Sequence, residues 1–246
     1  MRILRPAAER GHTQIDWLDS WHSFSFSDYN DDRWERFRAL RVINDDIIAP
    51  GQGFGTHPHR DMEIITWVLD GALEHRDSVG GGGVLRHGDV QVMSAGTGIR
   101  HSEFNASKSE PVRLLQCWIM PDKAGVRPTY GQVNIPTADR QDRWAVLAAG
   151  GGRDAALAIA ANTAMLTALL TPGKRLDYPI ATSRHAWIQV ARGTVEIDGQ
   201  QLAEGDGLGI SSEPGLSLVA STPAEVLLSI SPDQGLRTNC ASANAR

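Results

Sequence analysis

The feature that most restricts the fold of this chain is an internal repeat. One copy reads "WVLDGALEHRD" followed by "LRHGDVQVMSAG", and the other reads "IQVARGTVEIDG" followed by "LAEGDGLGISSE". Both copies run in the order strand, Gly turn, strand, Gly-Asp, strand. When Gly71 is superposed on Gly193 and Gly88 on Gly205, the first copy is five residues longer, and the glycines at 80–83 absorb the excess. The repeat therefore predicts two related β-structured halves.

The rest of the chain consists of short apolar runs separated by turn residues. The Asp-Gly pairs at 70–71 and 198–199 are typical of tight turns between paired strands. Many short strands of this kind favour a sandwich or barrel over alternating strands and helices. The predicted strands include 38–44, 63–69, 113–120, 156–160, 165–170, 186–191 and 225–230.

These patterns together predict an all-β fold of two tandem β-barrels of the jelly-roll type. A polar segment at 137–143 is the expected boundary between them. We therefore expect an N-terminal barrel over residues 1–138 and a C-terminal barrel over residues 139–246.

Composition excludes several classes of protein. The net charge of -5 argues against direct nucleic-acid binding, which usually requires a concentrated basic face. Only two cysteines occur, and Cys117 lies within an apolar run while Cys240 lies in a polar tail, so a disulfide framework is not expected. No segment approaches the roughly 20 apolar residues that span a bilayer, and the first residues do not resemble a signal peptide. We expect a cytoplasmic protein with no membrane partner.

Two pairs of potential metal ligands stand out in the first half. His57 and His59 are one residue apart, and so are His101 and Glu103. Because side chains alternate between the two faces of a strand, each pair projects from one face. The glycine-rich segment at 94–100 would let the chain bend into a barrel before His101. If the two strands are neighbours, three imidazoles and a carboxylate converge, which suits a first-row transition metal with open coordination positions.

The spacing of these residues resembles the two motifs of the cupin family. The matching positions of both motifs, in order, are Gly51, His57, His59, Glu63, Gly71 and then Gly88, Ser94, Gly96, His101, Asn105, with Ser94 where the family has proline. The segment 20–135, with "WHSFSFSDY" and "GDVQVMSAGTGIRHSEFN", resembles one bicupin branch, the pirin family.

The pirin resemblance implies a single metal, usually iron, in the N-terminal barrel. Carried over, its ligands are His57, His59, His101 and Glu103. The general cupin pattern would instead make Glu63 the carboxylate ligand. Strand parity does not decide between the two, since Glu63 is an even number of residues from both histidines of its motif. The resemblance favours Glu103, with Glu63 left as a residue that orients a ligand histidine.

The repeat indicates that the second barrel lacks this site. The four ligand positions map onto Pro179, Ala181, Leu218 and Ala220, none of which ligates a metal. His185 falls on the Glu63 position and stands alone, so we interpret it as structural. No metal is expected in the C-terminal barrel.

For function, the resemblance implies a quercetin 2,3-dioxygenase-like enzyme that cleaves flavonols with O2. The expected cofactor is one divalent transition metal, Fe(II) first, with Zn, Ni, Cu or Mn as alternatives. Glu103 would be catalytic and would accept the proton of the flavonol 3-hydroxyl group. The alternatives are a metal-responsive regulatory protein of the pirin type, which binds a protein partner without turnover, and another bicupin oxygenase or isomerase.

Three further features are given structural interpretations. His75 and His87 flank a hairpin and are predicted to be exposed. The glycines at 80–83 lack the Lys-Ser/Thr of a phosphate-binding loop and are predicted to form a hairpin loop. Cys117 is predicted to be a small buried apolar residue.

Overall fold

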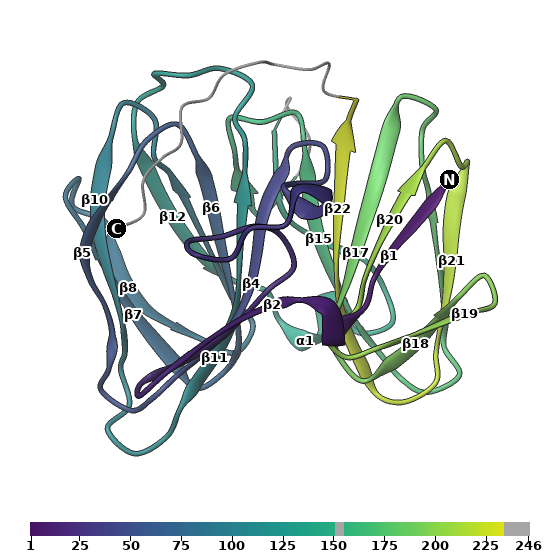
Figure 1. The fold of residues 1–246 in the computed structure, drawn as a ribbon, viewed down its shortest axis with the longest axis horizontal. Coiled ribbons are helices and arrows are strands. Elements are labelled where there is room, and N and C mark those ends of the chain that lie inside the picture. The colour runs from purple at the N-terminus through teal and green to yellow at the C-terminus, as the bar shows by residue number, and fades with distance from the viewer. Residues whose placement is uncertain (151–154, 234–246) are drawn as a thin grey trace.

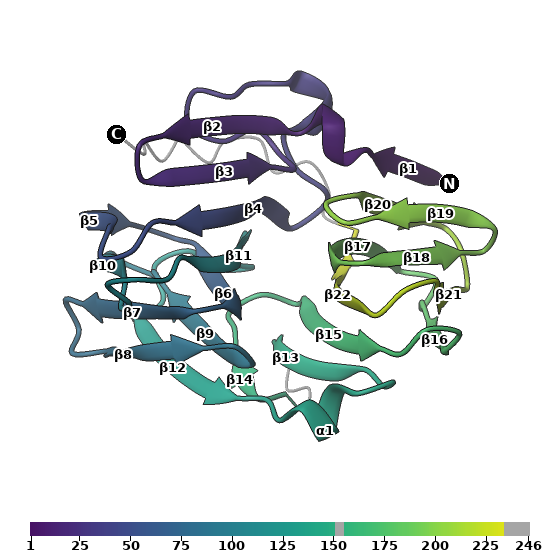
Figure 2. The ribbon, with the colours of Figure 1, turned by 90° about the horizontal axis from the view of Figure 1, so that it is seen from below.

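The structure is a computed structural model that describes residues 1–150 and 155–233. Two β-barrels lie side by side, and each is made of one seven-stranded and one four-stranded sheet (Figures 1 and 2). The predicted all-β, two-barrel fold is confirmed. Cys240 lies outside the described residues.

The first barrel contains the strands that carry the predicted ligands. Its larger sheet comprises β2 (Gly11–Ile15), β3 (Leu18–His22), β4 (Leu40–Ile48), β6 (Glu63–Asp70), β9 (Asp89–Ser94), β11 (Val112–Ile119) and β12 (Thr129–Asn134). The spatial order is β12-β9-β6-β11-β4-β3-β2. Its smaller sheet comprises β5 (Gly53–His59), β7 (Ala72–Asp77), β8 (Gly82–Arg86) and β10 (Ile99–Asn105), in the order β5-β10-β7-β8.

The second barrel repeats this arrangement. Its larger sheet comprises β1 (Arg2–Arg5), β13 (Ala145–Ala149), β14 (Leu157–Ala158), β15 (Ala164–Leu170), β17 (Arg184–Arg192), β20 (Gly207–Ser211) and β22 (Ala224–Pro232). Its order is β1-β20-β17-β22-β15-β13-β14. Its smaller sheet comprises β16 (Arg175–Pro179), β18 (Thr194–Ile197), β19 (Gln200–Ala203) and β21 (Gly215–Ala220), in the order β16-β21-β18-β19. Short helices are η1 (Ala7–Glu9), η2 (Asp32–Trp34) and α1 (Thr137–Arg140), the last between the barrels.

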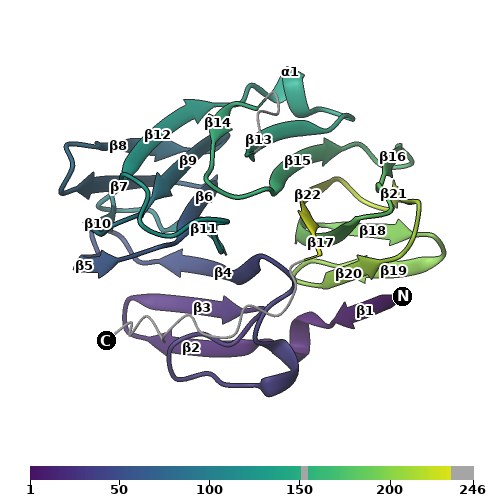
Figure 3. The same cartoon turned by 90° about the horizontal axis from the view of Figure 1, so that it is seen from above.

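One strand lies in the barrel opposite to the one its sequence position suggests. β1 pairs antiparallel with β20, with Arg2 opposite Ile210, and so forms an edge of the second barrel's sheet (Figure 3). The division at residue 138 assigned β1 to the first barrel. The pairing of β1 with β20 fixes the start of the chain to the second barrel. The domain boundary at residue 138 stays a prediction.

The glycines that define the repeat have matching conformations. Gly71 and Gly193 both have a φ of 75°, and Gly88 and Gly205 have φ values of 87° and 86°. A Cβ on Gly71 would lie 2.5 Å from the carbonyl oxygen of Pro111, and one on Gly193 would lie 2.1 Å from that of Pro223. Each turn therefore requires glycine both for its φ and for space.

The predicted strands are present, with one exception in extent. Five of them overlap β4, β6, β11, β17 and β22, although 38–44 covers only residues 40–44 of β4, and 165–170 lies within β15. The predicted strand 156–160 is reduced to the two residues of β14, which pairs parallel to β13.

The two barrels pack against each other through their larger sheets. Leu115 and Cys117 of β11 belong to an apolar cluster that also holds Trp187 and Leu227 of the second barrel. Cys117 is buried, as predicted. Arg113 adds a polar link, since its Nε lies 2.9 Å from Asp45 Oδ1 and its Nη1 lies 2.7 Å from Glu204 Oε1 of the second barrel.

The interiors of the barrels differ in polarity. The second barrel is filled by one large apolar cluster, which includes Leu218 and Ala220. The first barrel has two smaller apolar clusters, around Val68 and around Ile64. Buried polar side chains lie among the strands that carry these clusters, and the candidate site is found there.

Candidate metal centre

Three imidazoles converge on the smaller sheet of the first barrel. β5 and β10 are antiparallel neighbours, with His101 opposite His57 and Ile99 opposite His59. The ring centroids are 4.4 Å apart for His57 and His101, and 4.8 Å apart for both other pairs. One ligand nitrogen from each ring lies within 4.8 Å of the others. Neighbouring strands and alternation thus bring together the three histidines that the sequence singled out.

Glu103 joins this cluster beyond a register shift. The pairing of β10 with β5 is irregular between His101 and Glu103, so that Glu103 lies opposite Phe54. A carboxylate oxygen of Glu103 lies within 4.8 Å of a ring nitrogen of His101. Glu103 therefore lies next to His101 and, with His75, forms a second cluster of potential ligand atoms that shares His101 with the three histidines.

The donor atoms of this cluster fit a divalent cation. His101 Nε2 and Glu103 Oε1 are buried and have no hydrogen-bond partner in the described part of the chain. Buried polar atoms are rarely left without a partner, and a metal that contacts both atoms would supply one. His57 Nδ1 lies 2.8 Å from the carbonyl oxygen of Gly55 and therefore donates to it, which leaves Nε2 with a free lone pair.

Burial keeps two of the imidazoles neutral. Desolvation, followed by the neighbouring histidines, lowers the pKa of His59 and of His101 to about 3. A neutral imidazole offers the lone pair that metal coordination requires. Nitrogen and carboxylate donors of this kind suit first-row transition metals.

Gln116 and Trp118 of β11 hold the carboxylate of Glu103. Gln116 Nε2 donates to Glu103 Oε2 at 2.9 Å, and Trp118 Nε1 donates to Gln116 Oε1 at 2.9 Å. The Trp118 ring also meets the His59 ring edge-on, with centroids 4.8 Å apart. This chain of contacts satisfies one carboxylate oxygen of Glu103 and leaves the other free.

Glu63, the alternative carboxylate, faces away from the cluster. It is fully buried, and it shares the face of β6 that carries Ile65 and packs toward the second barrel. Ser94 Oγ donates to Glu63 Oε2 at 2.5 Å. Asp61, with a φ of 48°, bends the chain between His59 and Glu63, so strand parity does not continue from one to the other.

His75 is buried, so the prediction that it is exposed is wrong. It lies on β7 directly opposite Glu103, and its Nδ1 is 3.3 Å from His101 Nδ1. Its ring stacks on Tyr130 with centroids 4.8 Å apart. His75 is two residues from the buried Leu73, so both side chains project from the inner face of β7. This spacing could have predicted that His75 is buried. His87 is exposed, as predicted.

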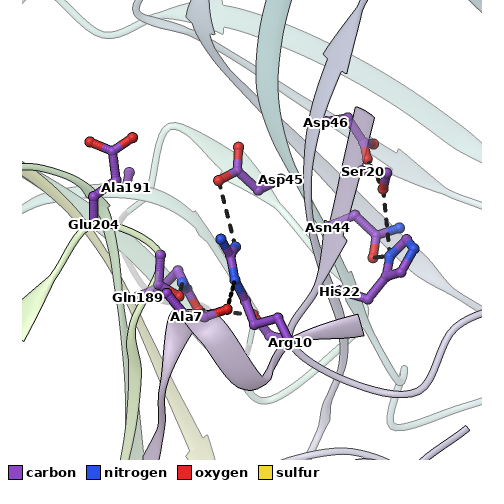
Figure 4. Close-up of polar contacts among 12 residues, drawn as sticks. Ala7, Arg10, Ser20, His22, Asn44, Asp45, Asp46, Gln189, Ala191 and Glu204 are labelled. Carbon is purple, nitrogen blue, oxygen red and sulfur yellow. Dashed lines mark hydrogen bonds and ion pairs between the residues drawn. The ribbon is translucent and has the colours of Figure 1, made fainter. Parts of the chain in front are cut away.

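A row of polar side chains crosses the inner face of the larger sheet. The residues that are paired from strand to strand are, in order, His22, Asn44, Gln116, Thr66 and Gln91. His22 Nδ1 contacts Asn44 Oδ1 at 2.8 Å (Figure 4). The Thr66 hydroxyl and the Gln91 amide are buried without partners among the described residues. This row makes the interior beneath Glu103 polar, in contrast to the second barrel.

Asp46 adds a buried acid next to this row. The Ser20 hydroxyl donates to its Oδ1 (Figure 4). Desolvation, with smaller contributions from Asp45 and Glu103, raises the pKa of Asp46 to about 7.

The corresponding positions of the second barrel are occupied differently. Leu218 and Ala220 lie in the apolar core, where no donor atom is offered. His185 is buried on β17, with Nε2 3.7 Å from Asp233 Oδ1. That the second barrel binds no metal stays a prediction.

Fold and site define a bicupin with a histidine cluster in its first barrel. The family model for Pirin matches residues 4–119, and that for the quercetinase C-terminal cupin domain matches residues 146–229. The chain is 46% identical over 228 residues to quercetin 2,3-dioxygenase of Escherichia coli (strain K12), covering 93% of this chain and 97% of that protein. It belongs to the pirin family.

Solved structures of similar proteins agree with this assignment. YhhW from Escherichia coli superposes with a TM-score of 0.90 and 44% identity, over 96% of this chain and 100% of that one. The bacterial pirin YhhW in complex with nickel(II) superposes with a TM-score of 0.89 and 44% identity, over 95% and 100% of the two chains. None of the helices in the described part of the chain has the length and apolarity required to cross a bilayer.

Proposed function

We propose that this protein is a metal-dependent dioxygenase that cleaves flavonols such as quercetin. Its metal would be held by His57, His59, His101 and Glu103. The observation that carries the proposal is the pair of buried, unpartnered atoms, His101 Nε2 and Glu103 Oε1, beside two further imidazoles. The name of the Escherichia coli relative supports the flavonol as substrate.

We propose Fe(II) as the working metal and a cytoplasmic location. The nickel(II) complex of the similar pirin supports a first-row divalent cation as the bound metal. Because three imidazoles and a carboxylate bind Zn, Ni, Cu and Mn as well, availability rather than affinity would decide occupancy. The four proposed ligands are therefore compatible with Zn, Ni, Cu or Mn as well as with Fe(II).

The bound metal would supply Lewis acidity, which acidifies a coordinated hydroxyl group. Glu103, as a ligand or as a base displaced from the metal, would accept the proton of the flavonol 3-hydroxyl at Oε1. Gln116 would keep the carboxylate in place during this transfer, because it holds Oε2 at 2.9 Å. Trp118, whose ring lies edge-on beside His59, would contact the flat rings of the substrate. O2 then reacts with the electron-rich flavonolate, and the ring opens with loss of carbon monoxide.

The experiment is oxygen uptake and carbon monoxide release by anaerobically Fe(II)-loaded protein with quercetin. His59→Ala should abolish both, because it removes one of the four donors. His12→Ala is the matched control: His12 contacts Asp19 on the edge hairpin of the larger sheet, so this variant should retain activity. If iron-loaded wild-type protein neither consumes O2 nor bleaches quercetin, the dioxygenase proposal is wrong. The regulatory pirin role, with metal binding but no turnover, would then be favoured.

A further inference from the structure

A chain of buried contacts runs from the metal cluster to the loop of residues 78–81, which joins β7 to β8. His101 Nδ1 lies 3.3 Å from His75 Nδ1, and His75 Nε2 lies 3.3 Å from Asp77 Oδ2. The side chains of His75 and Asp77 are both fully buried. Neither residue belongs to the ligand set of the proposed function.

Asp77 is fixed in turn by the loop that follows β7. Its second oxygen, Oδ1, accepts hydrogen bonds from the backbone N–H groups of Val79 at 2.9 Å and Gly81 at 2.8 Å. A Cβ on Gly81 would lie 2.3 Å from Asp77 Oδ2 and 2.6 Å from Tyr130 Cγ. Glycine at 81 is therefore required for Asp77 and the Tyr130 ring to approach the loop so closely.

Only one arrangement of protons satisfies this chain while leaving a ligand atom free. A carboxylate accepts but does not donate, so His75 Nε2 must carry the proton that faces Asp77. His75 Nδ1 is then an acceptor, and His101 Nδ1 must carry the proton between the two rings. His101 Nε2, which is buried and unpartnered, is left with its lone pair.

We propose that Asp77 and His75 are positioning residues that fix His101 in the tautomer whose Nε2 binds the metal. The loop of residues 78–81 between β7 and β8 holds Asp77 in place. It therefore acts on the metal ligand His101 through the side chains of Asp77 and His75. Outer hydrogen bonds of this type set the orientation of ligand histidines and commonly change metal affinity by about 10–100-fold when removed. The inference rests on the metal site of the proposed function, but not on the substrate.

The discriminating variant is Asp77→Asn, which preserves shape. Its amide oxygen can still accept from the two loop N–H groups, which turns the amide N–H toward His75 Nε2. His75 would then have to accept at Nε2 and donate at Nδ1, and His101 Nδ1 would become the acceptor. That tautomer places a proton on His101 Nε2, where it blocks coordination.

The readout is the ¹⁵N chemical shifts of the imidazoles in the metal-free protein, together with Zn(II) affinity by competition with a chelator. We expect wild-type His101 to be protonated at Nδ1, and Asp77→Asn to bind Zn(II) about 10–100-fold more weakly. Glu74→Gln, on the exposed face of the same strand, should bind Zn(II) as the wild type does. Gly81→Ala should weaken binding as well, because its methyl group would displace Asp77.

Two results would overturn the inference. One is wild-type His101 protonated at Nε2 in the metal-free protein. The other is wild-type Zn(II) affinity in a folded Asp77→Asn variant, with folding checked by thermal unfolding. Neither measurement uses quercetin, so failure of the dioxygenase proposal leaves the test intact.

Discussion

Asp46 should make the stability of the metal-free protein depend on pH. Its pKa is raised from 3.8 to about 7, first because burial disfavours the charged form. Between these values the native state binds a proton that the unfolded state has released, so the free energy of unfolding falls as the pH rises. Each pH unit amounts to about 1.4 kcal/mol well inside this range and to less near pH 7, where Asp46 is half deprotonated, so the loss from pH 5 to pH 7 is about 2 kcal/mol.

Asp46→Asn removes the titratable carboxyl group but keeps an oxygen that accepts the hydrogen bond from the Ser20 hydroxyl. The free energy of unfolding of the variant minus that of the wild type should therefore grow by about 3 kcal/mol from pH 5 to pH 8, with most of the change below pH 7. Urea unfolding of chelator-treated protein measures it, and Asp28→Asn, at an exposed position, is the control. A difference that stays constant with pH, or decreases, would refute the reasoning.

Three further outcomes are expected. Glu103→Gln should weaken Zn(II) binding by at least about tenfold, whereas Glu63→Gln should bind like the wild type, because Glu63 faces the second barrel; equal losses measured by chelator competition would contradict this. The imidazole NMR signals of His59 and His101 in metal-free protein should not titrate between pH 8 and pH 5, since their pKa is about 3; a midpoint near pH 6.5 would count against the described burial. Burial raises the pKa of the Cys117 thiol to about 12, so in a Cys240→Ser variant a thiol reagent at pH 8 should label Cys117 only after urea unfolding; rapid labelling of the native variant would contradict it.

The architecture could be predicted because its signals are local and repeated. Gly71 and Gly193 mark the same turn in both barrels, and the structure gives them the same φ. The convergence of the His57/His59 pair with the His101/Glu103 pair followed from strand alternation and one assumption of adjacency, whereas the choice of Glu103 over Glu63 rested on the pirin resemblance. The pairing of β5 with β10 supplies that adjacency.

Other positions depended on features that a sequence pattern does not contain. By sequence spacing alone, Glu63 would project from the same face as His57 and His59. The turn at Asp61 interrupts the strand alternation, and Glu63 faces the second barrel instead. His75 flanks a hairpin, which favours exposure, yet pairing of β7 with β10 places it inside the barrel. The placement of β1 in the second barrel comes from a long-range pairing with β20 for which nothing in "RILR" gives a signal.

We propose that one metal is bound between β5 and β10. Anomalous diffraction at the zinc edge, from crystals of protein loaded with Zn(II), tests it most directly. We expect one peak in the first barrel, at about 2.0–2.2 Å from a ring nitrogen of His57, His59 and His101 and from a carboxylate oxygen of Glu103. A peak coordinated by Glu63, or a peak in the second barrel with none among these four residues, would contradict it.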